Sequence, residues 1–234
     1  MNNLMQEFPL MVGNIIDHAA RYHPNRKIIC RTVEGPIVTS SWLEIRTKAL
    51  KLTKALLKLG VKEGDVVGVM AWNTARHLEV VYGVPGSGAI NHTLNPRLFS
   101  EQLIYIINHA EDKMLMVDAD LVPVIETIIQ KCPKVQNVIV MTDAKNMPKT
   151  TIENIICYEQ LVNNEDSDID WIKRSEYDAC GICYTSGTTG NPKGVVYTHR
   201  SNTLHALASS APDMLGLAST ETIMPVVPLF HANG

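Results

Sequence analysis

Helix and strand signals alternate along most of this chain, and the alternation restricts its fold more than any other feature. The segment 41–59 predicts a helix, because Ser41 and Glu44 have capping-box spacing and apolar residues follow at intervals of three and four. Gly60 is typical of the residue that follows a helix. Residues 66–72 are apolar and rich in valine, which predicts a buried strand. By the same criteria we expect helices at 74–84, 100–109 (capped by Ser100) and 122–131, and strands at 88–92, 114–117, 135–141 and 179–184.

This order of elements predicts an α/β fold with a doubly wound, mostly parallel sheet that helices cover on both faces. We expect residues 1–175 to form the first α/β part of a large N-terminal domain. Residues 176–234 are expected to begin a second α/β part of the same domain.

Three further segments have weaker signals. Residues 143–170 are more polar and less periodic, and 163–168 predicts a surface loop. A helix is expected to start near His199 or Ser201. Residues 222–230 predict another apolar strand, although two prolines interrupt it.

Composition excludes several classes of protein. The 234 residues carry a formal net charge of −3 without a basic tract, so we expect no nucleic-acid partner. We expect no signal peptide, and no apolar run has membrane-spanning length. The five cysteines are an odd number without framework spacing, which favours a reduced, cytoplasmic setting.

The segment 184–194, with the sequence YTSGTTGNPKG, combines four serine or threonine hydroxyls, three glycines and one lysine. Glycines let backbone N–H groups turn toward a ligand, and the hydroxyls and Lys193 add donors and positive charge, so the segment suits a polyphosphate. A flexible polar turn is the alternative. The Walker A pattern of nucleoside triphosphatases and kinases does not match, since Pro192 precedes the lysine and Gly194 follows it.

The same segment resembles the phosphate loop of the adenylate-forming superfamily, which includes acyl-CoA synthetases, peptide-synthetase adenylation domains and luciferases. Each fixed position of the family pattern (aromatic, Thr-Ser-Gly-Thr-Thr-Gly, any residue, Pro-Lys-Gly) is matched. Pro228-Leu229-Phe230-His231-Ala232-Asn233 is similar to a second motif of fatty-acid-activating members. Upstream, His77-Leu78-Glu79, Asn95-Pro96-Arg97-Leu98 and the stretch 105–113 resemble medium- and long-chain acyl-CoA synthetases.

The resemblance implies an AMP-forming fatty acid–CoA ligase that uses ATP, Mg²⁺ and CoA. A fatty-acid carboxylate would attack the α-phosphate of ATP, and CoA would then attack the acyl-adenylate. It also implies that Thr185 is a magnesium ligand and that His231, otherwise a packing histidine, lies near the carboxylate and α-phosphate. The residues that it implies for the β- and γ-phosphates are Thr185, Ser186, Gly187, Thr188, Thr189, Gly190 and Lys193.

The resemblance implies that many of the family's binding and catalytic residues lie further along the sequence. They include an adenine-binding segment, a magnesium-binding glutamate and a C-terminal domain with a catalytic lysine. We therefore expect the chain to be an N-terminal fragment that makes no acyl-CoA by itself. The alternative is a catalytically dead fragment that acts as a weak nucleotide binder or a subunit-contact module. A homodimer, and peripheral membrane contact through the lipid substrate, are compatible with the main interpretation.

Two other patterns are weaker. Cys180 and Cys183 have the spacing of a redox or zinc pair, but they lie in a predicted strand, where residues three apart point to opposite faces. The glycines of 83–88 follow a predicted helix instead of a strand, which is the reverse of a dinucleotide-binding loop. We expect both patterns to be structural.

Overall fold

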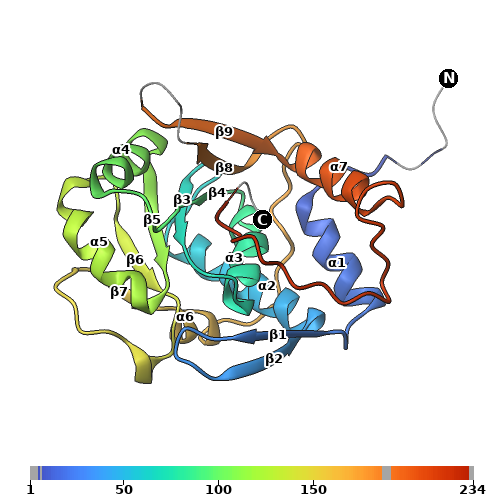
Figure 1. The fold of residues 1–234 in the computed structure, drawn as a ribbon, viewed down its shortest axis with the longest axis horizontal. Coiled ribbons are helices and arrows are strands. Elements are labelled where there is room, and N and C mark those ends of the chain that lie inside the picture. The colour runs from blue at the N-terminus through green and yellow to red at the C-terminus, as the bar shows by residue number, and fades with distance from the viewer. Residues whose placement is uncertain (1–4, 6, 186–190, 232–234) are drawn as a thin grey trace.

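A computed structural model describes residues 5, 7–185 and 191–231. Its main sheet has seven strands in the order β7-β6-β5-β3-β4-β8-β9, and every neighbouring pair is parallel except β8 and β9 (Figure 1). This confirms the predicted α/β fold with a mostly parallel sheet. The strands are β3 (Val66–Met70), β4 (Ile90–Thr93), β5 (Asp112–Val117), β6 (Asn137–Val140), β7 (Ile155–Cys157), β8 (Ala179–Thr185) and β9 (Lys193–Thr198).

Helices cover both faces of the sheet, as a doubly wound fold requires. One apolar cluster joins α2 (Trp42–Lys58), α3 (Ala75–Gly86) and α6 (Tyr158–Asn163) to one face. A second cluster joins α4 (Ser100–Ala110) and α5 (Val122–Ile128) to the other. Along β3 the side chains alternate between the two clusters, with Val67 and Val69 in the first and Met70 in the second.

The local signals of the helix at 41–59 are confirmed. The Ser41 side chain accepts from the Glu44 N–H, and the Glu44 carboxylate accepts from the Ser41 N–H at 2.7 Å. Gly60 has a φ of +84°, a conformation that costs glycine little. The predicted cap at Ser100 is wrong. Phe99 is the N-cap of α4, and its N–H donates to the Gln102 side chain, so Ser100 is the first helical residue.

Several elements escaped the sequence analysis. The N-terminal part holds α1 (Val12–Tyr22) and an antiparallel hairpin of β1 (Lys27–Arg31) and β2 (Ile37–Ser41). The polar stretch 143–170 contains β7 and α6. β8 and β9 continue the same sheet as the preceding strands, and the division of the chain at residue 175 stays a prediction.

The strand predicted at 222–230 is wrong, since this segment has no regular structure. A proline has no N–H, so the two prolines of this segment cannot donate hydrogen bonds to a neighbouring strand. The carbonyls of Pro225 and Val227 accept hydrogen bonds of 3.2 and 3.0 Å from the Asn73 side chain instead. Most of its apolar side chains are exposed, among them Ile223 and Met224. Among the helices of the described residues, none combines the length and apolar character needed to cross a bilayer.

A buried acidic side chain lies between α2, α3 and α6. Glu79 is 1% exposed and accepts a hydrogen bond of 2.7 Å from the Tyr158 hydroxyl. Lys48 Nζ lies 3.6 Å from a Glu79 carboxylate oxygen, and the Lys48 side chain is partly exposed. Burial raises the pKa of Glu79 to about 7, because a charged carboxylate loses hydration here.

This pKa predicts a pH-dependent effect of Glu79→Gln. The pKa of Glu79 is higher in the folded chain than its ordinary 4.5, so ionisation destabilises the fold as pH rises through this window. We expect the variant to gain about 2 kcal/mol more stability relative to wild type at pH 8 than at pH 5. Urea unfolding at both pH values measures this, with the exposed Glu101→Gln as control. An equal difference at the two pH values would contradict the assignment.

Candidate active site

The predicted phosphate loop follows β8 at the carboxyl edge of the parallel strands. β8 runs parallel to β4, which runs parallel to β3, so these three strands end at the same edge. Thr185 is the last residue of β8 and is exposed. Ligand sites of open α/β sheets lie at this edge. The next predicted site residues, Ser186, Gly187, Thr188, Thr189 and Gly190, lie outside the described residues.

Lys193 opens β9, the antiparallel partner of β8. Its backbone is opposite Thr185, and Gly194 is opposite Tyr184. The two ends of the loop are therefore held side by side by strand pairing, and Lys193 is exposed at the same end as Thr185. The sequence analysis did not predict this strand.

Tyr184 forms the base from which the loop starts. A hydrogen bond of 2.6 Å joins its hydroxyl to His109 Nδ1, and its ring lies 5.1 Å from the ring of His92, centroid to centroid. Burial raises the pKa of Tyr184 to about 12, so the hydroxyl stays protonated at neutral pH. A Cβ on Gly194 would lie 3.1 Å from Tyr184 Cζ, which explains why glycine fits this position of the motif.

Beneath Tyr184 lies a fully buried ionisable pair. His92 Nδ1 is 2.8 Å from Asp112 Oδ1, and both side chains have 0% exposure. Burial raises the pKa of Asp112, and the adjacent His92 opposes this shift. His92 Nε2 has no hydrogen-bond partner among the described residues. The pair connects β4 to β5 behind the start of the loop.

The second motif reaches the same edge of the sheet. Phe230 is 2% exposed and packs edge-to-face on Trp72, with ring centroids 6.0 Å apart. The Phe230 carbonyl lies 4.0 Å from the Cys183 sulfur, two residues before the end of β8. His231 follows directly and is exposed. The fold thus brings His231 toward the strand end that carries Thr185.

Asn73 fixes this arrangement, and sequence analysis missed it. It lies just after β3, and its side-chain oxygen accepts from the Leu229 N–H at 2.7 Å while its amide group bonds two carbonyls of the same segment. The available signal was its position, because a polar residue directly after a buried parallel strand lies at the edge where sites form.

The weaker sequence patterns have structural roles. Cys180 and Cys183 are both buried in β8, and burial raises the pKa of Cys180 to about 12, so this thiol is protonated at neutral pH. Gly83 and Gly86 lie in α3, where an added Cβ would come within 2.9 Å of the Ala49 carbonyl and 2.4 Å of the Trp171 ring, respectively. These glycines permit close packing and do not form a dinucleotide loop.

Comparison with known proteins defines the class to which this fold and site belong. The model of the AMP-binding enzyme family matches residues 16–234. The chain therefore belongs to the AMP-binding enzyme family, in agreement with the motif at 184–194.

Among its relatives, a medium-chain-fatty-acid–CoA ligase of Ectopseudomonas oleovorans is 43% identical over 98% of this chain and 42% of the relative. A 3-methylmercaptopropionyl-CoA ligase of Ruegeria lacuscaerulensis is 42% identical over the same shares. The crystal structure of a long-chain-fatty-acid–CoA ligase from Archaeoglobus fulgidus superposes with a TM-score of 0.82 at 26% identity, over 99% of this chain and 45% of that one. The chain thus spans less than half the length of these relatives, and it corresponds to the N-terminal part of such a ligase.

Proposed function

We propose that this chain is the N-terminal part of an ATP-dependent fatty acid–CoA ligase that forms an acyl-adenylate and then acyl-CoA, releasing pyrophosphate and AMP. The observation that carries the proposal is the convergence of two motifs at one edge of the sheet. Thr185 and Lys193 flank the predicted phosphate loop there, and Phe230, the residue before His231, has its carbonyl 4.0 Å from the Cys183 sulfur of β8.

In the first step, a carboxylate oxygen attacks the α-phosphorus and the bond to the β-phosphate oxygen breaks. Two anions must approach each other, so positive charge and N–H donors have to offset their repulsion. Lys193 and the hydroxyls and amides of the loop would hold the β- and γ-phosphates. Negative charge that develops on the departing pyrophosphate then lies beside the lysine.

His231 is proposed to lie near the attacking carboxylate and the α-phosphate. Its backbone N–H donates to the Pro228 carbonyl at 2.9 Å, and its side chain is exposed at the end of this turn. A neutral imidazole can orient one of these oxygens by donating a hydrogen bond.

Mg²⁺, when bound with ATP, would neutralise part of the negative charge of the phosphates. Thr185 offers one hydroxyl ligand at the end of β8. No group of three His, Cys, Asp or Glu side chains that could hold a metal occurs in the part of the chain that the structure describes.

In the second step, the CoA thiolate attacks the acyl carbon and AMP leaves with the carboxylate oxygen. A fatty acid is the proposed acyl substrate, on the strength of the medium-chain and long-chain ligases among the similar proteins. The 3-methylmercaptopropionyl-CoA ligase, at nearly equal identity, leaves the acyl chain length open. The cytoplasmic location, the homodimer and the membrane contact stay predictions.

The test uses the completed ligase, meaning this chain followed by the part that its relatives carry beyond the match. With ATP, Mg²⁺, CoA and a fatty acid, we expect AMP, pyrophosphate and acyl-CoA in equal amounts, and none of them without the acid. ADP as product would contradict the proposal. The 234-residue chain alone should form no acyl-CoA, and weak ATP binding without turnover by the completed protein would favour a dead nucleotide binder.

A further inference from the structure

The turn between β3 and α3 lies where the order of the parallel strands reverses. β3 has β4 on one side and β5 on the other, although both follow it in the sequence. In open α/β sheets such a reversal leaves a crevice at the carboxyl ends of the strands, and ligand sites form there. Trp72 and Asn73 occupy the turn that starts at this crevice. Their contacts therefore bear on how the site is built.

Each polar group of Trp72 has a partner in the body of the protein. The backbone N–H donates to Asp118 Oδ2 at 2.7 Å, and the indole Nε1–H donates to Asp120 Oδ2 at 3.0 Å. The Trp72 carbonyl lies 3.0 Å from His77 Nδ1. Burial lowers the pKa of His77 to about 4, so the imidazole is neutral near pH 7 and its Nδ1–H donates to this carbonyl. These three bonds fix both the place and the orientation of Trp72.

The two aspartates come from the end of β5. Asp118 directly follows this strand, and its N–H donates to the Met70 carbonyl of β3 at 3.0 Å. Its side chain is buried, and Asp120 lies two residues further, in the short helix η1 (Ala119–Leu121), where it is exposed. Hydrogen bonds that a carboxylate accepts are stronger than those between neutral groups. Two different positions of the β5 end thus hold one residue of the neighbouring turn.

The same turn binds the second motif on its other side. The ring of Trp72 contacts the ring of Phe230 at an interplanar angle of 66°, and the Asn73 side chain bonds the Leu229 N–H. Figure 1 shows the chain after α7 (His199–Ser210) returning across the molecule to the region of α3. Phe230 is followed directly by His231. A displacement of Trp72 would therefore be passed to Phe230 and from there to His231.

We propose that Asp118 and Asp120 are positioning residues for acyl-adenylate formation. They hold Trp72 in place, and Trp72 in turn sets the place of Phe230 and of the adjacent His231. We call Trp72 with its two aspartates the Trp72 clamp. The task of His231 rests on the proposed function, whereas the clamp itself rests on the contacts of the turn.

Hydrogen exchange of the 234-residue chain, followed by mass spectrometry, tests the clamp without activity. At pH 8 Asp118 is mostly ionised, because burial raises its pKa to about 7. Asp118→Ala and Asp120→Ala should each speed exchange of the Leu229 and His231 N–H groups about tenfold, and leave exchange in β7 and α6 unchanged. Asp118→Asn keeps an acceptor for the turn and should stay near wild type. Because Asp120 is exposed, its variant keeps the test valid if Asp118→Ala unfolds the chain.

Single-turnover kinetics of the completed ligase test the effect on chemistry. We expect Asp118→Ala and Asp120→Ala to slow acyl-adenylate formation about tenfold, because a displaced group no longer meets the reacting atoms. ATP affinity, and thioester formation from supplied acyl-adenylate, should be unchanged. In a His231→Ala background neither alanine variant should cause a further loss, because both act through His231.

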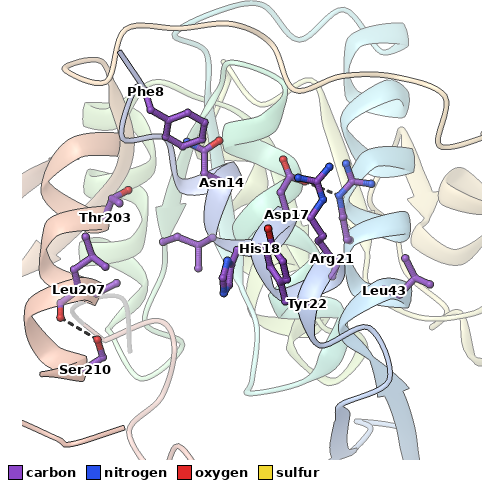
Figure 2. A pocket seen from close by; sticks show the side chains of 14 residues that line it. Phe8, Asn14, Asp17, His18, Arg21, Tyr22, Leu43, Thr203, Leu207 and Ser210 are labelled. Carbon is purple, nitrogen blue, oxygen red and sulfur yellow. Dashed lines mark hydrogen bonds and ion pairs between the residues drawn. The ribbon is translucent and has the colours of Figure 1, made fainter. Parts of the chain in front are cut away.

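A groove elsewhere in the molecule supplies the matched control. Figure 2 shows Asp17 in this groove of about 1030 Å³ between α1 and α7. Asp17 accepts a hydrogen bond of 3.1 Å from the indole Nε1–H of Trp171, just as Asp120 accepts from Trp72. Among the described residues, neither the turn after β3 nor the segment 222–231 lines the groove. Asp17→Ala should therefore change neither the exchange of 222–231 nor acyl-adenylate formation.

Three results would each overturn the proposal. The first is unchanged exchange of the Leu229 and His231 N–H groups in both alanine variants. The second is a full further loss of rate when either variant is combined with His231→Ala, and the third is an equal loss in Asp17→Ala. A wild-type completed ligase that forms no acyl-adenylate would contradict the proposed function instead, and hydrogen exchange would still decide whether the Trp72 clamp exists.

Discussion

Lys193→Met in the completed ligase is expected to slow acyl-adenylate formation about 10²-fold, with a smaller change in ATP affinity. In the proposed complex, backbone amides of the loop and magnesium would also hold ATP, so the loss of one lysine should remove only part of its binding. In the proposed mechanism, charge on the leaving pyrophosphate would grow in the transition state beside Lys193, whose backbone is paired with Thr185 in the β8–β9 ladder. An interaction that strengthens as charge develops lowers the barrier more than the Michaelis constant.

Single-turnover measurement of each half-reaction checks this prediction. Thioester formation from supplied acyl-adenylate should be nearly unchanged, because no pyrophosphate leaves in that step. Lys134→Met removes an exposed lysine that pairs with Glu111. Glu111 directly precedes β5, at the opposite end of the parallel strands from Thr185, so this variant should affect neither step. Equal loss of both half-reactions in Lys193→Met would mean that this lysine has a structural role.

Asp112→Ala is expected to have the largest effect on stability, a loss of about 3 kcal/mol in the free energy of unfolding. The variant leaves His92 fully buried without a partner at Nδ1, and Nε2 already lacks one in the described structure. A buried polar group that loses its partner retains the whole cost of its lost hydration. Asp112→Asn keeps an acceptor for the imidazole and should lose less.

Urea unfolding of the 234-residue chain measures this difference. The control is Glu63→Ala, which breaks an ion pair of 2.8 Å with Arg174 in which the Glu63 side chain is 61% exposed. Exposed pairs contribute little, so its loss should stay below about 1 kcal/mol. If the two alanine variants were equally stable, the buried pair under Tyr184 would have no special role in the fold.

The sequence predicted the parts of the fold that depend on local pattern. Periodicity and capping located the helix that starts at Trp42, and the valine-rich run located β3. β9 was missed because its strand character comes from pairing with β8, a contact across the loop. The segment 222–230 has a strand-like composition, and the Asn73 side chain binds its carbonyls instead of a neighbouring strand.

For the candidate site, the sequence identified the motif residues but not the contacts that support them. The motif alone named Lys193 and His231, because their residue types and spacing match the family pattern. The supporting contacts of Asn73, and the packing of Tyr184 against Gly194, could not be predicted, since they join residues that are distant in sequence or on different strands. Their roles follow only from the three-dimensional arrangement.

The central claim is that the carboxylate attacks the α-phosphate, and isotope transfer tests it most directly. The completed ligase is given unlabelled ATP, CoA and a fatty acid with ¹⁸O in both carboxylate oxygens, and the products are analysed by mass spectrometry. Our account predicts one ¹⁸O atom in each AMP, the second in the thioester carbonyl, and none in pyrophosphate. Unlabelled AMP, or ADP with ¹⁸O in inorganic phosphate, would contradict it.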